Sequence, residues 1–149
     1  MADTCILVVD DEESVATTIE AILKLDGHDV LAVTSGEAAI RLLHERQFDV
    51  VLTDLRLADI DGIEILREVQ RTSPDTAAIM LTGYASLESA VEALRSGAYD
   101  YLMKPSDVEE LRATVNRAIE AASRPVAASF SVSKSTPSRR RRSSSRRRP

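Results

Sequence analysis

Five polar side chains each follow an apolar run that has the length of a β-strand. They are Asp10, Asp11, Asp54, Thr82 and Lys104. Strands written as continuous runs of Val, Ile and Leu are typical of parallel sheets that are buried on both faces. The carboxyl ends of such strands meet at one edge of the sheet, where reactive sites form. We therefore expect these five side chains to share one site.

Three carboxylates in one site need positive charge beside them, because two like charges ~4 Å apart repel by about 4 kcal/mol at an effective dielectric constant of ~20. Lys104 supplies one positive charge, and a hard divalent cation would supply two more. Mg²⁺ takes oxygen ligands and typically combines one or two carboxylates with phosphate oxygens. This set favours phosphoryl transfer, in which Asp54 is the nucleophile and becomes an aspartyl phosphate. Mg²⁺ and Lys104 would each hold a phosphoryl oxygen, and Thr82 would donate a hydrogen bond to one.

The elements that must position this site alternate along the chain. Strands are predicted at 5–9, 29–33, 50–53, 77–82 and 99–103. Helices with apolar residues at helical spacing are predicted from about 14, 35, 62, 86 and 106 onward, and the fourth is indicated by Leu87, Ala90, Val91 and Leu94. Five strand–helix units predict an α/β fold, with a doubly wound, five-stranded parallel sheet and helices on both faces.

Composition and charge divide the chain into two parts. Residues 1–123 contain 10 Lys and Arg and all 24 Asp and Glu, a net charge of −14, whereas residues 124–149 contain the other nine basic residues and no acid. We interpret 1–123 as one folded domain and 124–149 as a disordered, basic, Ser/Arg-rich tail. The tail is either a solvated extension, including a cloning or frameshift scar, or an arm for weak, non-specific nucleic acid binding.

The composition also excludes several classes of protein. A single cysteine, Cys5, excludes an intrachain disulfide, and no phosphate-binding P-loop motif is present. No apolar run approaches the ~18 residues of a membrane span, and the first residues lack the basic region of a secretion signal. We therefore expect a cytoplasmic protein without a membrane partner.

Four stretches of the sequence resemble the receiver domain of two-component response regulators: ILVVDDE, DVVLTDLRLADIDGIEIL, IMLTGYAS and GAYDYLMKP. The resemblance covers residues 5–121, and the stretch 81–105 is most similar to receivers of nitrogen-regulation-class enhancer-binding activators. It implies a flavodoxin-like (βα)5 fold with strand order 2-1-3-4-5. It also implies a regulator that a sensor histidine kinase or a phosphotransfer protein activates by phosphorylation. Such a protein is a phosphoacceptor that catalyses its own phosphorylation and dephosphorylation, not an enzyme with a separate substrate.

By position, the resemblance implies a role for each residue of the site. Asp54 would be phosphorylated, and Lys104 would contact the phosphoryl group. Asp11, Asp54 and the backbone carbonyl of Arg56 would bind Mg²⁺ directly, with Asp10 acting through water.

The resemblance also implies roles for residues beside the site. Thr82 and Tyr101 would be the switch pair, which reshapes the surface of the helix after Ser86, the 99–103 strand and the last helix, and a homodimer would form on phosphorylation. The Lys104–Pro105 bond would be cis. Arg56 and Tyr84 would flank the path of attacking water, and their bulk would lengthen the life of the phosphoryl group.

Three interpretations of the whole chain remain open. It is a signalling module without an attached effector, a receiver fragment of a transcriptional activator, or a basic-tailed nucleic-acid-binding protein whose receiver has lost its chemistry. The retained acidic and basic site residues argue against the last. The chain departs from the family at Leu57-Ala58, where Met-Pro is common, so the resemblance does not fix the stiffness of this loop.

Overall fold

Five strands and five helices alternate in the computed structural model, which describes residues 4–83 and 86–123. They are β1 (Cys5–Val9), α1 (Glu13–Leu25), β2 (Asp29–Val33), α2 (Gly36–Glu45), β3 (Val50–Thr53), α3 (Gly62–Thr72), β4 (Ala77–Thr82), α4 (Leu87–Arg95), β5 (Asp100–Met103) and α5 (Val108–Ser123). The first four strands have the predicted bounds. The fifth begins one residue later than predicted, and α5 begins at Val108 because the backbone carbonyl of Asp107 accepts the first helical hydrogen bond, from the Leu111 N–H.

The strands form one parallel sheet in the order β2-β1-β3-β4-β5, which confirms the predicted fold class and strand order. Val9 is paired with Thr53 across β1 and β3, so Asp10 and Asp54 follow neighbouring strand ends in register. The Asp54 N–H continues the ladder by donating to the Val9 carbonyl at 3.0 Å. Two further strand ends, those of β4 and β5, lie at the same edge of the sheet.

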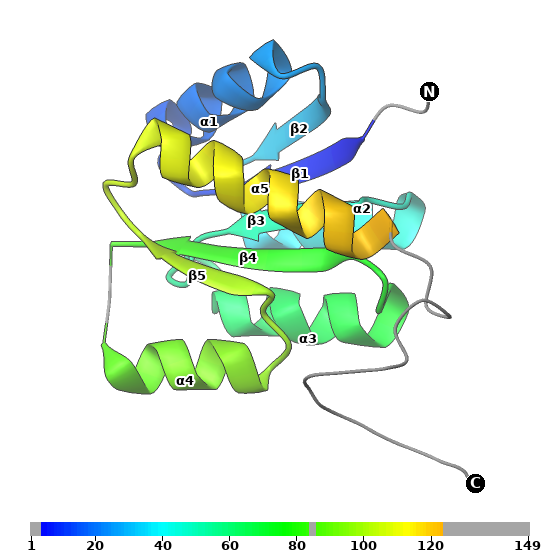
Figure 1. Cartoon of the computed structure of the whole chain (residues 1–149). Coiled ribbons are helices and arrows are strands. Elements are labelled where there is room, and N and C mark those ends of the chain that lie inside the picture. Colours follow the sequence, from blue (N-terminus) through cyan, green and yellow to red (C-terminus); the bar gives the residue numbers. More distant parts are fainter. Residues whose placement is uncertain (1–3, 84–85, 124–149) are drawn as a thin grey trace, which may run out of the picture.

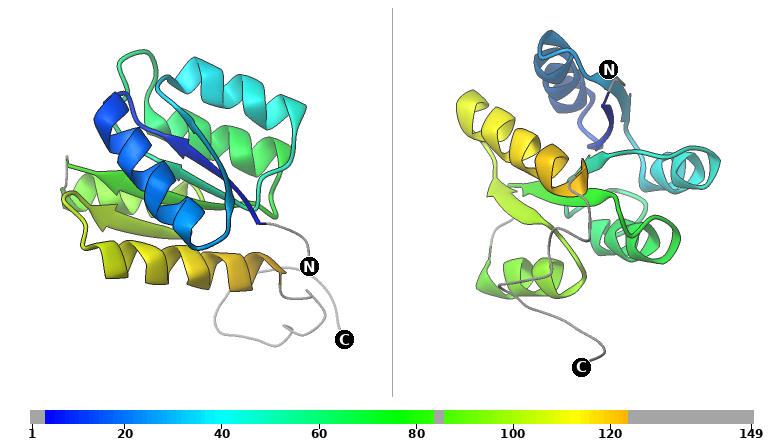
Figure 2. Two further views of the ribbon diagram at one scale, coloured as in Figure 1. Left: turned by 90° about the horizontal axis from the view of Figure 1, so that it is seen from above. Right: turned by 45° about the vertical axis from the view of Figure 1, so that its right-hand side comes forward.

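Helices cover both faces of the sheet (Figure 1), with α1 and α5 on one face and α2, α3 and α4 on the other. Figure 2 shows the two layers from two further directions. Alternate residues of β1 serve the two layers: Ile6 and Val8 pack in the core under α1 and α5, whereas Leu7 and Val9 pack in the core under α2 and α3. Because successive strand residues point to opposite faces, a strand with a core on each side is apolar at every position.

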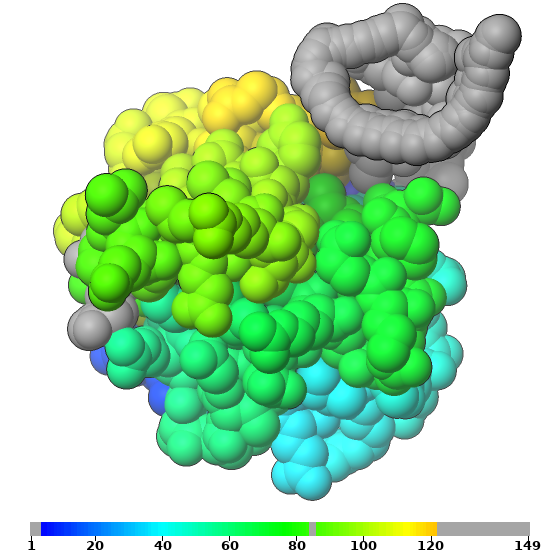
Figure 3. Space-filling model, turned by 90° about the horizontal axis from the view of Figure 1, so that it is seen from below, coloured from blue at the N-terminus to red at the C-terminus, as the bar shows by residue number. Residues whose placement is uncertain are grey.

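The helix α4 is buried differently from what its apolar residues suggest. Ser89 and Ala93 form its buried side, while the Leu87 and Leu94 side chains are 81% and 52% exposed. Small residues let α4 lie close to the β5 edge, where the Ser89 Oγ and the Tyr101 hydroxyl are hydrogen-bonded at 3.0 Å. Figure 3 shows the face of the molecule that α2, α3 and α4 cover.

Candidate functional site

Three carboxylates meet at the carboxyl ends of β1 and β3. Asp10, Asp11 and Asp54 each offer an oxygen, and these oxygens all lie within 4.8 Å of one another. Asp10 and Asp54 are buried, whereas Asp11 is exposed. The Asp10 carboxylate also accepts the Glu12 N–H at 2.9 Å, which fixes its orientation at the start of α1. The prediction that these residues come together is thus met by the geometry.

Lys104 neutralises part of this negative charge from the end of β5. Its Nζ lies 2.6 Å from Asp10 Oδ2 and 2.8 Å from Asp54 Oδ2. Burial acts to lower the pKa of Lys104, but the hydrogen bonds and charges of Asp10 and Asp54 outweigh burial, so the pKa lies above its ordinary value. The ammonium is therefore positively charged at neutral pH and bridges the two buried carboxylates.

The donor set fits a hard divalent cation. All three side chains offer carboxylate oxygens, which Mg²⁺ prefers. One ammonium against three carboxylates leaves a formal charge of −2 on the cluster, which a divalent cation would balance. Asp11 is the exposed member of the set, so the cluster is open to solvent on its side.

The loop between β3 and α3 is folded tightly against the Asp54 backbone. The Arg56 N–H donates to Asp54 Oδ1 at 3.2 Å, and Arg56 forms an antiparallel bridge with Asp61. Gly62 closes the loop by donating its N–H to the Leu55 carbonyl at 2.7 Å. A Cβ at Gly62 would lie 2.3 Å from the Asp54 carbonyl oxygen, so this close approach requires glycine.

Thr82 and Tyr101 lie on the adjacent strands β4 and β5. Thr82 ends β4 and is buried, and its carbonyl accepts the Lys104 N–H at 2.8 Å. Tyr101 is half-buried in β5, with its hydroxyl bonded to Ser89 of α4. The Lys104–Pro105 bond is cis, as the resemblance implied. Tyr84 lies outside the described residues.

Sequence reasoning missed two residues that tie this site to the surrounding helices. The sequence places Ser89 only in the first turn of a predicted helix, whereas in the structure its Oγ is hydrogen-bonded to the Tyr101 hydroxyl. Asp59 was visible only as a loop aspartate, yet its carboxylate accepts backbone N–H groups from the start of α2. Neither contact has a local sequence signal.

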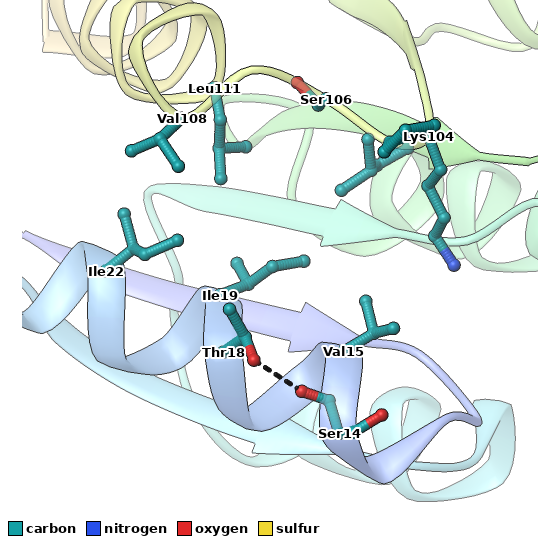
Figure 4. A pocket seen from close by; sticks show the side chains of 11 residues that line it. Ser14, Val15, Thr18, Ile19, Ile22, Lys104, Ser106, Val108 and Leu111 are labelled. Carbon is teal, nitrogen blue, oxygen red and sulfur yellow. Dashed lines mark hydrogen bonds between the residues drawn. The ribbon is translucent and has the colours of Figure 1, made fainter.

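A groove of about 510 Å³ opens beside Lys104, between α1 and α5 (Figure 4). Val15, Ile19 and Ile22 line it from α1, while Val108 and Leu111 line it from α5. The wall is therefore largely apolar, and its Lys104 is the residue that contacts Asp10 and Asp54 of the acidic cluster.

A five-stranded parallel sheet in the order 2-1-3-4-5, with three carboxylates and a lysine at the carboxyl ends of its strands, defines a flavodoxin-like α/β domain. The family model described as "Response regulator receiver domain" matches residues 6–116. The chain belongs to this family.

The similar proteins include transcriptional regulators. The transcriptional regulatory protein ZraR of Escherichia coli (strain K12) is 44% identical over 114 residues, 76% of this chain and 26% of the relative. The luminescence regulatory protein LuxO of Vibrio campbellii is 40% identical over 117 residues, 78% of this chain and 26% of the relative. The chain thus spans about a quarter of the length of these curated relatives.

Solved structures of receivers match most of the fold. A CheY-like receiver from Methanospirillum hungatei has a TM-score of 0.79 at 30% identity, covering 81% of this chain and 97% of that one. The beryllofluoride-activated NtrC4 receiver domain dimer has a TM-score of 0.76 at 35% identity, covering 80% of this chain and 98% of that one.

Within residues 4–83 and 86–123, every helix is too short or too polar to cross a membrane.

Proposed function

We propose that Asp54 accepts a phosphoryl group from a sensor histidine kinase or a phosphotransfer protein, and that this phosphorylation activates the regulator. The observation that carries the proposal is the bridge from the Lys104 ammonium to Asp10 and Asp54 within the three-carboxylate cluster. Such a cluster has the charges and the rigid strand-end position that phosphoryl transfer needs.

In the transfer, a carboxylate oxygen of Asp54 attacks phosphorus as the phosphorus–nitrogen bond of the donor phosphohistidine breaks. The imidazole nitrogen keeps the electron pair and takes up a proton. The Lys104 ammonium, which is paired with the Asp54 carboxylate before the transfer, then pairs with the phosphoryl oxygens. Mg²⁺ bound by Asp11, Asp54 and the Arg56 carbonyl, with Asp10 acting through water, would supply further positive charge to those oxygens.

The switch we propose begins at the Thr82 hydroxyl, which moves toward the new phosphoryl group and vacates space for the ring of Tyr101. That motion would break the bond between Tyr101 and Ser89 and so reshape the α4–β5–α5 face. NMR spectra with and without beryllofluoride test this. Shifts confined to the phosphate pocket, with the Ser89 amide unchanged, would count against it.

Two surfaces suit two different partners. The apolar groove between α1 and α5 ends at Lys104, so a phosphodonor helix lying along it would reach Asp54. The exposed Leu87 and Leu94 of α4 suit a homodimer formed on phosphorylation. Val108→Glu should therefore slow phosphoryl transfer from a histidine kinase but not from acetyl phosphate. Leu94→Glu should weaken the phosphorylated dimer and leave the rate of phosphoryl transfer unchanged.

If Leu94→Glu slowed transfer from the kinase and Val108→Glu weakened the dimer, the two surfaces would have to be assigned the other way round.

Hydrolysis of the phosphoryl group requires water to attack phosphorus in line with the bond to Asp54. We propose that Arg56 and Tyr84 hinder this path and that the chain catalyses its own slow dephosphorylation. The double variant Arg56→Ala with Tyr84→Ala should lose phosphate faster. An unchanged rate would remove both residues from this role.

We further propose that residues 1–123 form the receiver and that 124–149 form a separate basic tail, which lies outside the described residues. The transcriptional regulatory protein ZraR is about four times as long as the region that matches this chain. A receiver fragment of a transcriptional activator and a free-standing module both stay open as interpretations. Cytoplasmic location and weak nucleic acid binding by the tail stay predictions. A DNA titration of the full chain against a chain ending at residue 123, at two salt concentrations, tests the tail.

The experiment that tests the proposed function is incubation with acetyl phosphate and Mg²⁺, followed by intact mass measurement. The wild-type chain should gain one phosphate only when Mg²⁺ is present. Asp54→Asn should abolish the gain, whereas Asp49→Asn, at the opposite end of β3, should not. Phosphate uptake by Asp54→Asn at the wild-type rate would overturn the assignment.

A further inference from the structure

The loop that carries Arg56 is attached to α2 as well as to its own strand. Leu57 and Ile60 pack against the core cluster beneath α2. A Cβ at Gly36, the first residue of α2, would lie 2.2 Å from Ile60 Cγ1, so the helix begins in direct contact with the loop. The loop therefore has apolar anchors on this side, although Ala58 stands where the family often has proline.

Asp59 adds a polar anchor at the same place. Its Oδ1 accepts the Gly36 N–H at 3.0 Å and its Oδ2 accepts the Glu37 N–H at 2.9 Å. These are backbone donors in the first turn of α2, which have no partner within the helix. The bonds from Gly36 and Glu37 lower the pKa of the Asp59 carboxyl below its ordinary value, so it is ionised at neutral pH. An ionised carboxylate at a helix N-terminus is also stabilised by the helix dipole.

We propose that Asp59 is a positioning residue for Mg²⁺, which holds the loop so that the Arg56 carbonyl and the Asp54 carboxylate present their oxygens together. This role rests on the proposed function. Arg56 transmits the constraint, because its N–H bonds to Asp54 Oδ1 and its backbone is bridged to Asp61, two residues after Asp59. These contacts join the start of α2 to Asp54 through Asp59 and Arg56. We call this set of contacts the clamp.

The expected change in Mg²⁺ affinity depends on the fraction of molecules whose loop is in the conformation that binds Mg²⁺. For a ligand that binds only one conformation, the apparent dissociation constant equals the intrinsic constant divided by the fraction of molecules in that conformation. Deleting the acceptor of a helix cap typically shifts such an equilibrium by about five-fold. Asp59→Ala should therefore weaken Mg²⁺ binding by about five-fold. Asp59→Asn keeps one acceptor oxygen and loses the charge, so its loss should be smaller.

Ser35→Ala is the matched control. The Ser35 side chain accepts the Ala38 N–H at 3.1 Å, so it caps the same helix end from the residue before the helix and not from the loop. Isothermal titration calorimetry of Mg²⁺ into the wild-type chain and the three variants gives the dissociation constants. Phosphorylation by acetyl phosphate should require more Mg²⁺ in Asp59→Ala, yet reach the wild-type rate at saturation.

Weaker binding in the order Asp59→Ala, then Asp59→Asn, with Ser35→Ala at the wild-type value, supports the clamp. Wild-type Mg²⁺ affinity in Asp59→Ala overturns it. An equal loss in Ser35→Ala also overturns it, because the effect would then arise from the stability of α2. If the wild-type chain itself fails to bind Mg²⁺, the proposed metal site is wrong and the clamp role falls with it.

Discussion

Replacing Lys104 with methionine isolates the electrostatic contribution of the acidic cluster to folding. Its Nζ lies 2.6 Å and 2.8 Å from two buried carboxylates. Each contact is a gross attraction of about 6 kcal/mol at an effective dielectric constant of ~20. Desolvation offsets most of this, and removing one partner of a buried pair typically costs about 3–5 kcal/mol. Because the Lys104 side chain is 18% exposed, we expect the free energy of unfolding to fall by the lower value, about 3 kcal/mol.

The assay is urea unfolding at neutral pH in the presence of a chelator, followed by circular dichroism. Lys24→Met is the control, since Lys24 pairs with Glu20 at 2.9 Å while its side chain is 54% exposed. Such an exposed pair contributes about 0.5 kcal/mol or less. Added Mg²⁺ should restore part of the stability of Lys104→Met, because a bound cation supplies positive charge to the same carboxylates. Equal losses in the two variants would refute the reasoning.

Three further predictions concern the loop, the surface and the lysine. Gly62→Ala should lower the free energy of unfolding by about 2 kcal/mol in urea unfolding. Gly83→Ala should change it little, because its added Cβ would come no nearer than 3.9 Å to a neighbour within residues 4–83 and 86–123. The hydrogen bond from Arg112 lowers the pKa of Asp26. The resulting stabilisation is full above the unfolded-state pKa and is lost as the pH falls through the lower folded-state value, so Arg112→Met should flatten this acid dependence in pH titrations of stability. Because the pKa of Lys104 is raised, its stabilisation is full below its ordinary value of 10.5 and should be lost only as the pH rises through the raised value, as alkaline unfolding would reveal.

The strands and the site were predictable because both depend on local patterns and topology. Each buried strand is a short apolar run, and a parallel sheet brings the ends of such runs to one edge, so Asp10, Asp54 and Lys104 could be placed together before any contact was known. The register of β1 against β3 then makes the Asp10–Asp54 pairing a consequence of the chain path.

Burial of α4 was not predictable in the same way. Leu87 and Leu94 lie at helical spacing, as core residues do, but they are exposed because the helix turns Ser89 and Ala93 toward the sheet edge. Which side of an edge helix is buried depends on its tertiary partners. The bond from Asp59 to α2 likewise spans more than twenty residues, and an aspartate in a turn carries no information about so distant a partner.

The most direct test of the central claim is to locate the phosphoryl group in the wild-type chain. After phosphorylation by acetyl phosphate with Mg²⁺, borohydride reduction converts an aspartyl phosphate to homoserine, which tandem mass spectrometry locates in the digested protein. We predict homoserine at position 54 alone, and none when Mg²⁺ is withheld. Homoserine at another aspartate with Asp54 unmodified would contradict the account.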